Sequence, residues 1–358
     1  MYNTDRLPEG TLPVVYAASI GHSGWFSHDL GESWQRAHTN WGGIYNESRC
    51  WCFAIHPDRP GELLAGTDQG IYRWDPRVQR WNYVPSPMDG LHILKLTQCP
   101  ANSDLIIAGT RPAELFRSED GGLTWEWTPI ANKTEVPYIN TPRVTSLQFD
   151  PEVAGKVWMT IEIDGVWRSD DAGKSWVRLG TDLPDQDTHN VVILRQDGKR
   201  VVLCTTEIGL FRSEDEGETF AKVDTGDIPY HYFRHMLHRP DNTGVLFLSV
   251  GDRPSGDDAM LLRSRDYGAN WEVVDLPGNQ NSTIWSISAH PADPMLLFCH
   301  SIMGEIYRSL DGGETWEKME KFLGELREVV WAPVPEQFLS DRPKAWVTAD
   351  EFAAESSA

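Results

Sequence analysis

Basic side chains recur at comparable positions along this chain of 358 residues. Each position lies seven residues before the His, Asp or equivalent residue that ends an apolar run. Six of the seven positions hold Arg or His, where the surrounding pattern requires no charge. An arginine side chain can bind a carboxylate, sulfate or phosphate through two parallel hydrogen bonds. The arginines therefore predict an anion site. The seven positions are Arg49, His92, Arg143, His189, His231, Thr283 and Arg327.

Acid–base chemistry is the second function that these residue types suggest. His189 and His231 are candidates for the general base and acid, with Tyr230 as a proton donor and Glu207 nearby. The predicted catalytic residues are therefore His189, His231, Tyr230 and Glu207. The predicted substrate-binding residues are Arg49, His92, Arg143, Arg327, Arg111, Tyr45 and Tyr138.

A divalent metal is a further hypothesis for the same histidines. Two imidazoles and one carboxylate satisfy the ligand requirement of Mn, Fe or Zn, and the candidate ligands are His189, His231, His300 and Glu207. No HExxH-type spacing supports this site. A purely structural alternative also stands, in which the arginines pair with Glu47, Glu162 and Asp164 to stabilise the channel.

A repeated octapeptide indicates which elements position these residues. SLDGGETW (309–316) has five close copies, at 27–34, 118–125, 169–176, 213–220 and 264–271, and a degenerate copy, WDPRVQRW, ends at Trp81. The closing aromatic residues are spaced by 44 to 51 residues, a period typical of a repeated supersecondary unit. Each unit contains four short apolar runs without helical periodicity. The sequence therefore predicts an all-β, seven-bladed propeller with four-stranded antiparallel blades.

The octapeptides match the Asp-box, or BNR repeat, S-x-D-x-G-x-T-W. The chain thus resembles the Asp-box propellers, which include sialidases, xyloglucan-degrading glycosidases, sortilin-type receptors and a photosystem assembly factor. This resemblance implies that the box joins the third and fourth strands, on the face away from the usual active site. The loops are therefore expected to be scaffold, with function at the opposite mouth of the central channel.

The domain limits follow from the same repeat. Residues 1–340 are predicted to form the propeller, closed by pairing of LPVVYAAS near the N-terminus with REVVWAP (327–333). Residues 341–358 are predicted to contain an extra strand, KAWVTAD, and a C-terminal tail.

Composition excludes several partners. A formal charge of −21 argues against nucleic acid, which is bound mainly through Lys and Arg. No apolar run approaches the length of about 20 residues that spans a bilayer, and the first residues lack the pattern of a signal peptide. A cytoplasmic location is therefore expected, with the five cysteines reduced in the core. No nucleotide or organic cofactor is indicated, and the oligomeric state is left open.

Three functions remain open after this comparison. The first is an enzyme with lyase- or hydrolase-type chemistry on a small, carboxylate-bearing anion at the channel mouth, with or without a metal. The second is a non-catalytic binding or assembly module. The third is a glycosidase or sialidase-like hydrolase. The sialidase resemblance implies three arginines around a carboxylate, but six blades and an Arg-Ile-Pro motif, neither of which this sequence shows.

Overall fold

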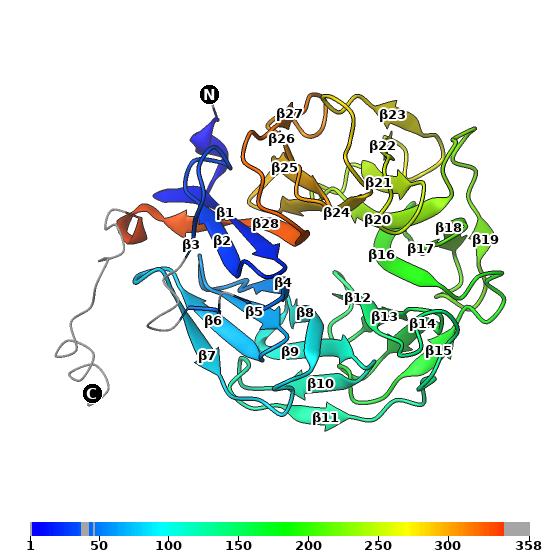
Figure 1. Cartoon of the computed structure of the whole chain (residues 1–358). Coiled ribbons are helices and arrows are strands. Elements are labelled where there is room, and N and C mark those ends of the chain that lie inside the picture. The colour runs from blue at the N-terminus through cyan, green and yellow to red at the C-terminus, as the bar shows by residue number, and fades with distance from the viewer. Residues whose placement is uncertain (1, 37–42, 46, 340–358) are drawn as a thin grey trace.

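The chain folds into a ring of seven four-stranded antiparallel sheets (Figure 1). The structure, a computed structural model, describes residues 2–36, 43–45 and 47–339. It confirms the predicted seven-bladed propeller. From the innermost strand outward, the blades are β28 (Leu326–Pro335), β1 (Thr11–Ser19), β2 (Gly24–Ser27) and β3 (Gln35–Arg36); β4 (Cys50–Ile55), β5 (Leu63–Thr67), β6 (Ile71–Asp75) and β7 (Arg80–Val84); β8 (His92–Cys99), β9 (Asn102–Arg111), β10 (Leu115–Ser118) and β11 (Glu126–Thr128); β12 (Val144–Phe149), β13 (Val157–Ile161), β14 (Gly165–Ser169) and β15 (Val177–Leu179); β16 (Thr188–Gln196), β17 (Lys199–Thr206), β18 (Gly209–Ser213) and β19 (Ala221–Lys222); β20 (Tyr232–His238), β21 (Leu246–Gly251), β22 (Ala259–Ser264) and β23 (Glu272–Val274); β24 (Ile284–His290), β25 (Asp293–Ser301), β26 (Ile306–Ser309) and β27 (Glu317–Lys318).

The two ends of the described chain meet in one blade. The strand β1 pairs with β28 from Thr11 opposite Pro335 to Ser19 opposite Leu326, and the two lie side by side in Figure 1. Short 3-10 helices flank this blade at Thr4–Arg6 and Glu336–Phe338. The predicted strand at 344–350 lies outside the described residues.

The Asp-box loops bond mainly to themselves. In the loop after β10, the hydroxyl of Ser118 donates to Asp120 Oδ1 (2.8 Å) and accepts from the Gly122 N–H (2.9 Å). Asp120 Oδ2 accepts from the Thr124 hydroxyl at 2.5 Å, and the Trp125 indole donates to the Gly122 carbonyl at 3.2 Å. The same Ser–Asp–Gly bonds recur in the other five octapeptides. These loops therefore hold the hairpins of the lower face, which we define as the face opposite the starts of the innermost strands.

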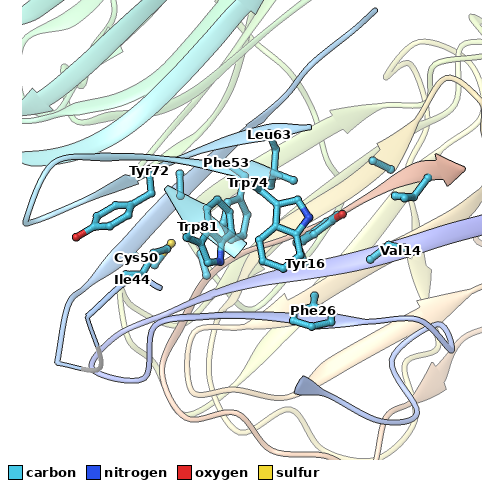
Figure 2. Packing of buried hydrophobic residues seen from close by; sticks show 14 residues of the cluster. Val14, Tyr16, Phe26, Ile44, Cys50, Phe53, Leu63, Tyr72, Trp74 and Trp81 are labelled. Atoms are coloured by element: carbon cyan, nitrogen blue, oxygen red, sulfur yellow. The ribbon is translucent and has the colours of Figure 1, made fainter. Parts of the chain in front are cut away.

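Large aromatic residues fill the space between blades. Figure 2 shows this packing between the first two blades, where the Phe53 and Trp81 rings are stacked with centroids 5.7 Å apart. Trp74 contacts the same indole at 5.1 Å. The degenerate octapeptide that ends at Trp81 has thus kept the aromatic residue that the core needs. The five cysteines are buried and free, as predicted.

Every innermost strand carries a β-bulge close to its start. In β4, Cys50 pairs with Thr67 and Cys52 pairs with Gly66, which leaves Trp51 as the extra residue. A bulge twists the strand locally and re-aims the side chain of the extra residue. The upper face, where the innermost strands begin, is therefore surrounded by seven bulged residues, namely Trp51, Leu94, Thr145, His189, Arg234, Trp285 and Arg327.

A histidine at the lower end of β24 should make stability depend on pH. The His290 Nδ1 atom accepts the Ala292 N–H at 3.1 Å, and burial lowers the pKa of this imidazole to about 4. The unfolded chain binds the proton near pH 6.5, so stability is complete above that pH and falls as the pH drops toward 4.

The variant His290→Asn should remove this dependence, because an amide oxygen can accept the same N–H without titrating. Asp150 accepts the N–H groups at the equivalent turn of β12. Chemical denaturation at pH 7 and pH 4.5 should show a stability loss smaller by about 1–2 kcal/mol in the variant. Equal losses in both proteins would contradict this role of His290.

Candidate functional site

Four bulged residues from consecutive blades form a continuous stack at the upper face. The Arg234 guanidinium carbon lies 3.7 Å from the centroid of the Trp285 ring. The Arg327 guanidinium lies 5.2 Å from the same ring and 5.0 Å from that of Trp51. Trp51 continues the row by stacking on His92, with centroids 5.3 Å apart. We call Arg234, Trp285, Arg327 and Trp51 the Arg–Trp stack.

The guanidinium of Arg234 is buried without a carboxylate partner. Its residue is 9% exposed, its Nε atom has no hydrogen-bond partner, and it forms no ion pair within the described part of the chain. Burial lowers the pKa of Arg234. A buried charge is normally paired and hydrogen-bonded, because its desolvation is otherwise uncompensated. Its contact with Trp285 covers one face of the group but leaves its N–H edge unused.

Two further N–H groups of the stack have no partner among the described residues. Arg327 donates from Nη2 to Glu325, but its Nε atom is buried and unpaired, and so is the Trp51 indole nitrogen. Burial lowers the pKa of Arg327 to about 10, with Glu325 acting in the opposite direction. The stack therefore presents three unused N–H donors, on the innermost strands β20, β28 and β4.

His189 is the bulged residue of β16, in the blade that precedes Arg234. It is 2% exposed, and its Nδ1 atom lies 2.7 Å from the Phe233 carbonyl oxygen, to which Nδ1–H must donate. The Nε2 atom lies 3.5 Å from Asp187 Oδ1, and the ring contacts Tyr232 with centroids 4.6 Å apart. The imidazole is thus held in one orientation beside a carboxylate, an arrangement suited to proton transfer.

The other predicted arginines are in different surroundings. Arg143 forms a two-pronged ion pair with Glu162, with N–O distances of 2.6 and 2.7 Å. This is the pairing that the structural alternative expected for that residue. Arg49 is exposed, and its backbone N–H donates to Asp68. Arg111 donates to the Ile139 carbonyl oxygen at 3.3 Å.

Several predicted residues lie on the periphery of the upper face. His231 and Tyr230 line a pocket of about 500 Å³ beside Ile208 and Phe233. The Tyr230 hydroxyl donates to Asp258 at 2.5 Å, which raises the pKa of the phenol to about 12. The side chains of Tyr45, Tyr138 and Glu207 are exposed.

The four predicted metal ligands are not grouped in this structure. Among the described residues, no three His, Cys, Asp or Glu side chains are arranged to hold a metal ion. His189 is buried against the Phe233 carbonyl, whereas His231 and Glu207 are exposed. His300 is buried, with Nδ1 3.0 Å from the Ser301 carbonyl oxygen. The two histidines predicted to converge, His189 and His231, therefore have separate surroundings, and acid–base chemistry by that pair is not supported.

The seven positions counted from the sequence are not equivalent to one another in their distance from the β-bulges. All seven lie within one residue of a strand start, but only His189 and Arg327 are bulged residues. The others lie two or three residues before the bulge of their strand. The cause is strand length, since β16 and β28 have 9 and 10 residues, whereas β4 has 6. Arg49, His92 and Arg143 lie two residues before the bulge of their strands. In the other four blades, the residues at this position are Asp187, Tyr232, Thr283 and Glu325.

Sequence reasoning missed Arg234, Trp51 and Trp285. A signal for them existed, because each is a large polar or aromatic residue near the start of an innermost strand. Counting back seven residues from the end of each innermost strand could not select them, because the distance from that end to the bulge differs between strands.

The repeats, the blades and the loop geometry together define the class of this protein. The chain is a seven-bladed β-propeller of the Asp-box (BNR) repeat superfamily. The BNR/Asp-box repeat model matches residues 307–318, and a model described as sortilin, neurotensin receptor 3, matches residues 164–258.

Individual relatives differ in what they do. Sortilin from Rattus norvegicus is 30% identical over 312 residues, which cover 73% of this chain and 36% of that protein. A xyloglucanase from Acetivibrio thermocellus is 24% identical over 233 residues, which cover 60% of this chain and 24% of the enzyme. The chain thus spans about a third or less of the length of these relatives.

Solved structures share the fold at low sequence identity. The GH74 xyloglucanase from Xanthomonas campestris aligns with a TM-score of 0.57 and 22% identity, over 80% of this chain and 46% of the enzyme. A structure titled YCF48 bound to D1 peptide aligns with a TM-score of 0.56 and 14% identity, over 91% of this chain and all of that chain. Within the described residues, no helix has the length and apolar character needed to cross a bilayer.

Proposed function

We propose that this propeller binds a small carboxylate-bearing molecule at its upper face and catalyses a lyase- or hydrolase-type reaction on it. The observation that carries the proposal is the Arg234 guanidinium, which is buried against Trp285 and unpaired among the described residues. A ligand carboxylate would supply the missing partner, and hydrogen bonds between charged groups contribute about 1.5–3 kcal/mol each. In a chain of net charge −21, a buried cation that forms no ion pair with any described carboxylate is unusual.

The residues around Arg234 suggest how a bound carboxylate would react. Arg234 holds the carboxylate and stabilises negative charge as it develops in the transition state. His189, on the adjacent strand, keeps Nδ1–H on the Phe233 carbonyl, so Nε2 is the atom that exchanges a proton with the ligand. Asp187 Oδ1 lies 3.5 Å from this atom.

The comparisons support a hydrolase or a binding protein more broadly. The relatives include xyloglucanases and sortilins, and the segment matched by the sortilin model contains both His189 and Arg234.

A second candidate function is non-catalytic binding of a larger partner. Large apolar side chains are exposed in the loops that surround the upper face, including Tyr138 (100%), Phe322 (59%) and Met303 (46%). Exposed apolar groups around a polar centre are typical of interaction surfaces. Such a partner would offer the carboxylate on a peptide or oligosaccharide, and no reaction would follow.

Calorimetric titration of the full chain with acetate, butyrate and benzoate tests the carboxylate site. We expect one carboxylate site per chain at constant ionic strength, and about 10- to 100-fold weaker binding in Arg234→Met. The control Arg195→Met should bind as the wild type does, because Arg195 is exposed and paired with Glu152 on the lower half of β16. Equal affinities in wild type and Arg234→Met would contradict the proposal.

Reaction and binding are separated by following a library of carboxylate esters and hydroxy acids by NMR. Conversion by the wild type but not by His189→Gln, with unchanged carboxylate affinity, would support the enzyme. Binding without conversion across the library would favour the second candidate.

A further inference from the structure

The residue after each bulge forms a second row below the Arg–Trp stack. In several blades this side chain accepts an N–H from the innermost strand of the next blade, as Asn190 Oδ1 does from Met236 at 3.1 Å. Such bonds satisfy backbone groups that face the ring axis and join adjacent strands. The other acceptors in this row are Glu328 (from Phe53), Ser146 (from Val191) and His235 (from Ile287).

Lys95 occupies the same row in β8 and departs from its pattern. It follows the bulged Leu94 and pairs with Gly109. An ammonium group has three donors and no acceptor, so it cannot bind the N–H of the next strand. Lys95 is half-buried, and it forms no ion pair with a carboxylate in the part of the chain that the structure describes. It is therefore a second cation near the axis without an acidic partner.

Lys95 and Arg234 come from opposite sides of the ring. β8 and β20 face each other across the centre in Figure 1. Both cations act on the same two buried imidazoles. The pKa of His235 is lowered first by burial and further by the charges of Lys95 and Arg234. The pKa of His300 is lowered first by burial and further by the charges of Arg327, Lys95 and Arg234. Lys95 and Arg234 also lie near the start of an innermost strand, at or beside its bulge, so they belong to opposite sides of the space at the upper end of the ring.

The acids near this space do not neutralise both cations. Glu325 is engaged by Arg327, and Glu162 by Arg143. Asp187 acts on the charge of Arg234 but lies beside His189, and it forms no ion pair with Arg234. Glu328 accepts the Phe53 N–H, and burial raises the pKa of its carboxyl group, with Lys95 acting in the opposite direction. One carboxylate at Arg234 would thus leave Lys95 without a partner.

We infer that the ligand is a dicarboxylate that spans the axis, with one carboxylate on Arg234 and the other on Lys95. This inference rests on the proposed carboxylate site and narrows its ligand class. A linear dianion satisfies two separated cations at once, whereas a monocarboxylate satisfies one. Each charge-assisted contact made by the second carboxylate adds affinity.

Calorimetry with malonate, succinate, glutarate, acetate and butyrate at constant ionic strength tests the inference on the full chain. In the wild type, the best dicarboxylate should bind at least about tenfold more tightly than either monocarboxylate. In Lys95→Met, this advantage should fall to less than about twofold, while the affinity for butyrate stays unchanged. The control is Lys199→Met. Lys199 is exposed and begins β17, in the hairpin at the lower face, so this variant should keep the full advantage.

The possible outcomes separate this inference from the proposed function. Equal affinity for mono- and dicarboxylates in the wild type, with loss of both in Arg234→Met, would overturn the dicarboxylate and keep the carboxylate site. A dicarboxylate advantage that persists in Lys95→Met would overturn the role of Lys95. Tighter binding of inorganic phosphate than of every dicarboxylate would overturn the spanning geometry. No binding of any of these anions would overturn the proposed function itself.

Discussion

In the absence of ligand, Arg234→Met is expected to be more stable than the wild type by about 1–3 kcal/mol. The buried guanidinium has lost its hydration, and within the described residues no carboxylate compensates for that loss. Methionine has a comparable length and would fill the space beside Trp285 with apolar atoms. The gain is reduced by loss of the contact with that indole, which contributes about 1–2 kcal/mol when desolvated.

The measurement is urea denaturation of both proteins, with and without the best-binding carboxylate. The ligand should stabilise the wild type by mass action and should stabilise Arg234→Met less, because that variant binds about 10- to 100-fold more weakly. The stability advantage of the variant should therefore shrink by up to about 1.4–2.7 kcal/mol as the ligand concentration rises. Such a decrease would show that binding, and not folding, accounts for the buried charge. A ligand-free variant that is less stable than the wild type would mean that Arg234 stabilises the ring directly.

Arg195→Met is the matched control for this comparison. Its guanidinium is exposed and paired with Glu152, and exposed ion pairs contribute only about 0–1 kcal/mol. We therefore expect a small loss of stability and no change in the effect of ligand.

The fold was predictable because its signal is local and repeated. Each octapeptide contains its own hydrogen-bond partners, as Ser118, Asp120 and Thr124 illustrate. Loop geometry is therefore encoded within eight residues, and its spacing gives the number of blades. The degenerate copy was recognisable because Trp81 fills the one large gap in the spacing of the closing aromatic residues.

The site was predictable only in part, because the direction of its side chains depends on the β-bulges, which the repeated octapeptide does not reveal. The sequence identified the starts of the innermost strands, and with them His189 and Arg327. It did not locate the bulges, where one extra residue shifts the alternation of faces. Arg49 was therefore predicted to bind the anion, whereas Trp51, two residues later, is the residue that contacts Arg327.

The acid–base hypothesis changed for a related reason. His189 and His231 were predicted to converge because they begin innermost strands of adjacent blades. Phe233 contributes to both environments, because its carbonyl oxygen accepts from His189 and the residue also lines the pocket that contains His231. Asp187 and Tyr232 are instead the neighbours of His189.

Trp125→Ala is expected to reduce the free energy of unfolding by about 3–5 kcal/mol, as deletion of a buried aromatic side chain does. Trp125 is 8% exposed and packs in the core between the second and third blades, and its indole N–H donates to the Gly122 carbonyl. Trp127, two residues along the same hairpin, is 58% exposed, so Trp127→Ala should change stability by less than about 0.5 kcal/mol. Both variants should keep the wild-type affinity for carboxylates, because the Asp-box side chains lie at the face opposite Arg234. Urea denaturation and calorimetry measure the two quantities separately. A folded Trp125→Ala protein with lost carboxylate binding would contradict the assignment of these loops to the scaffold.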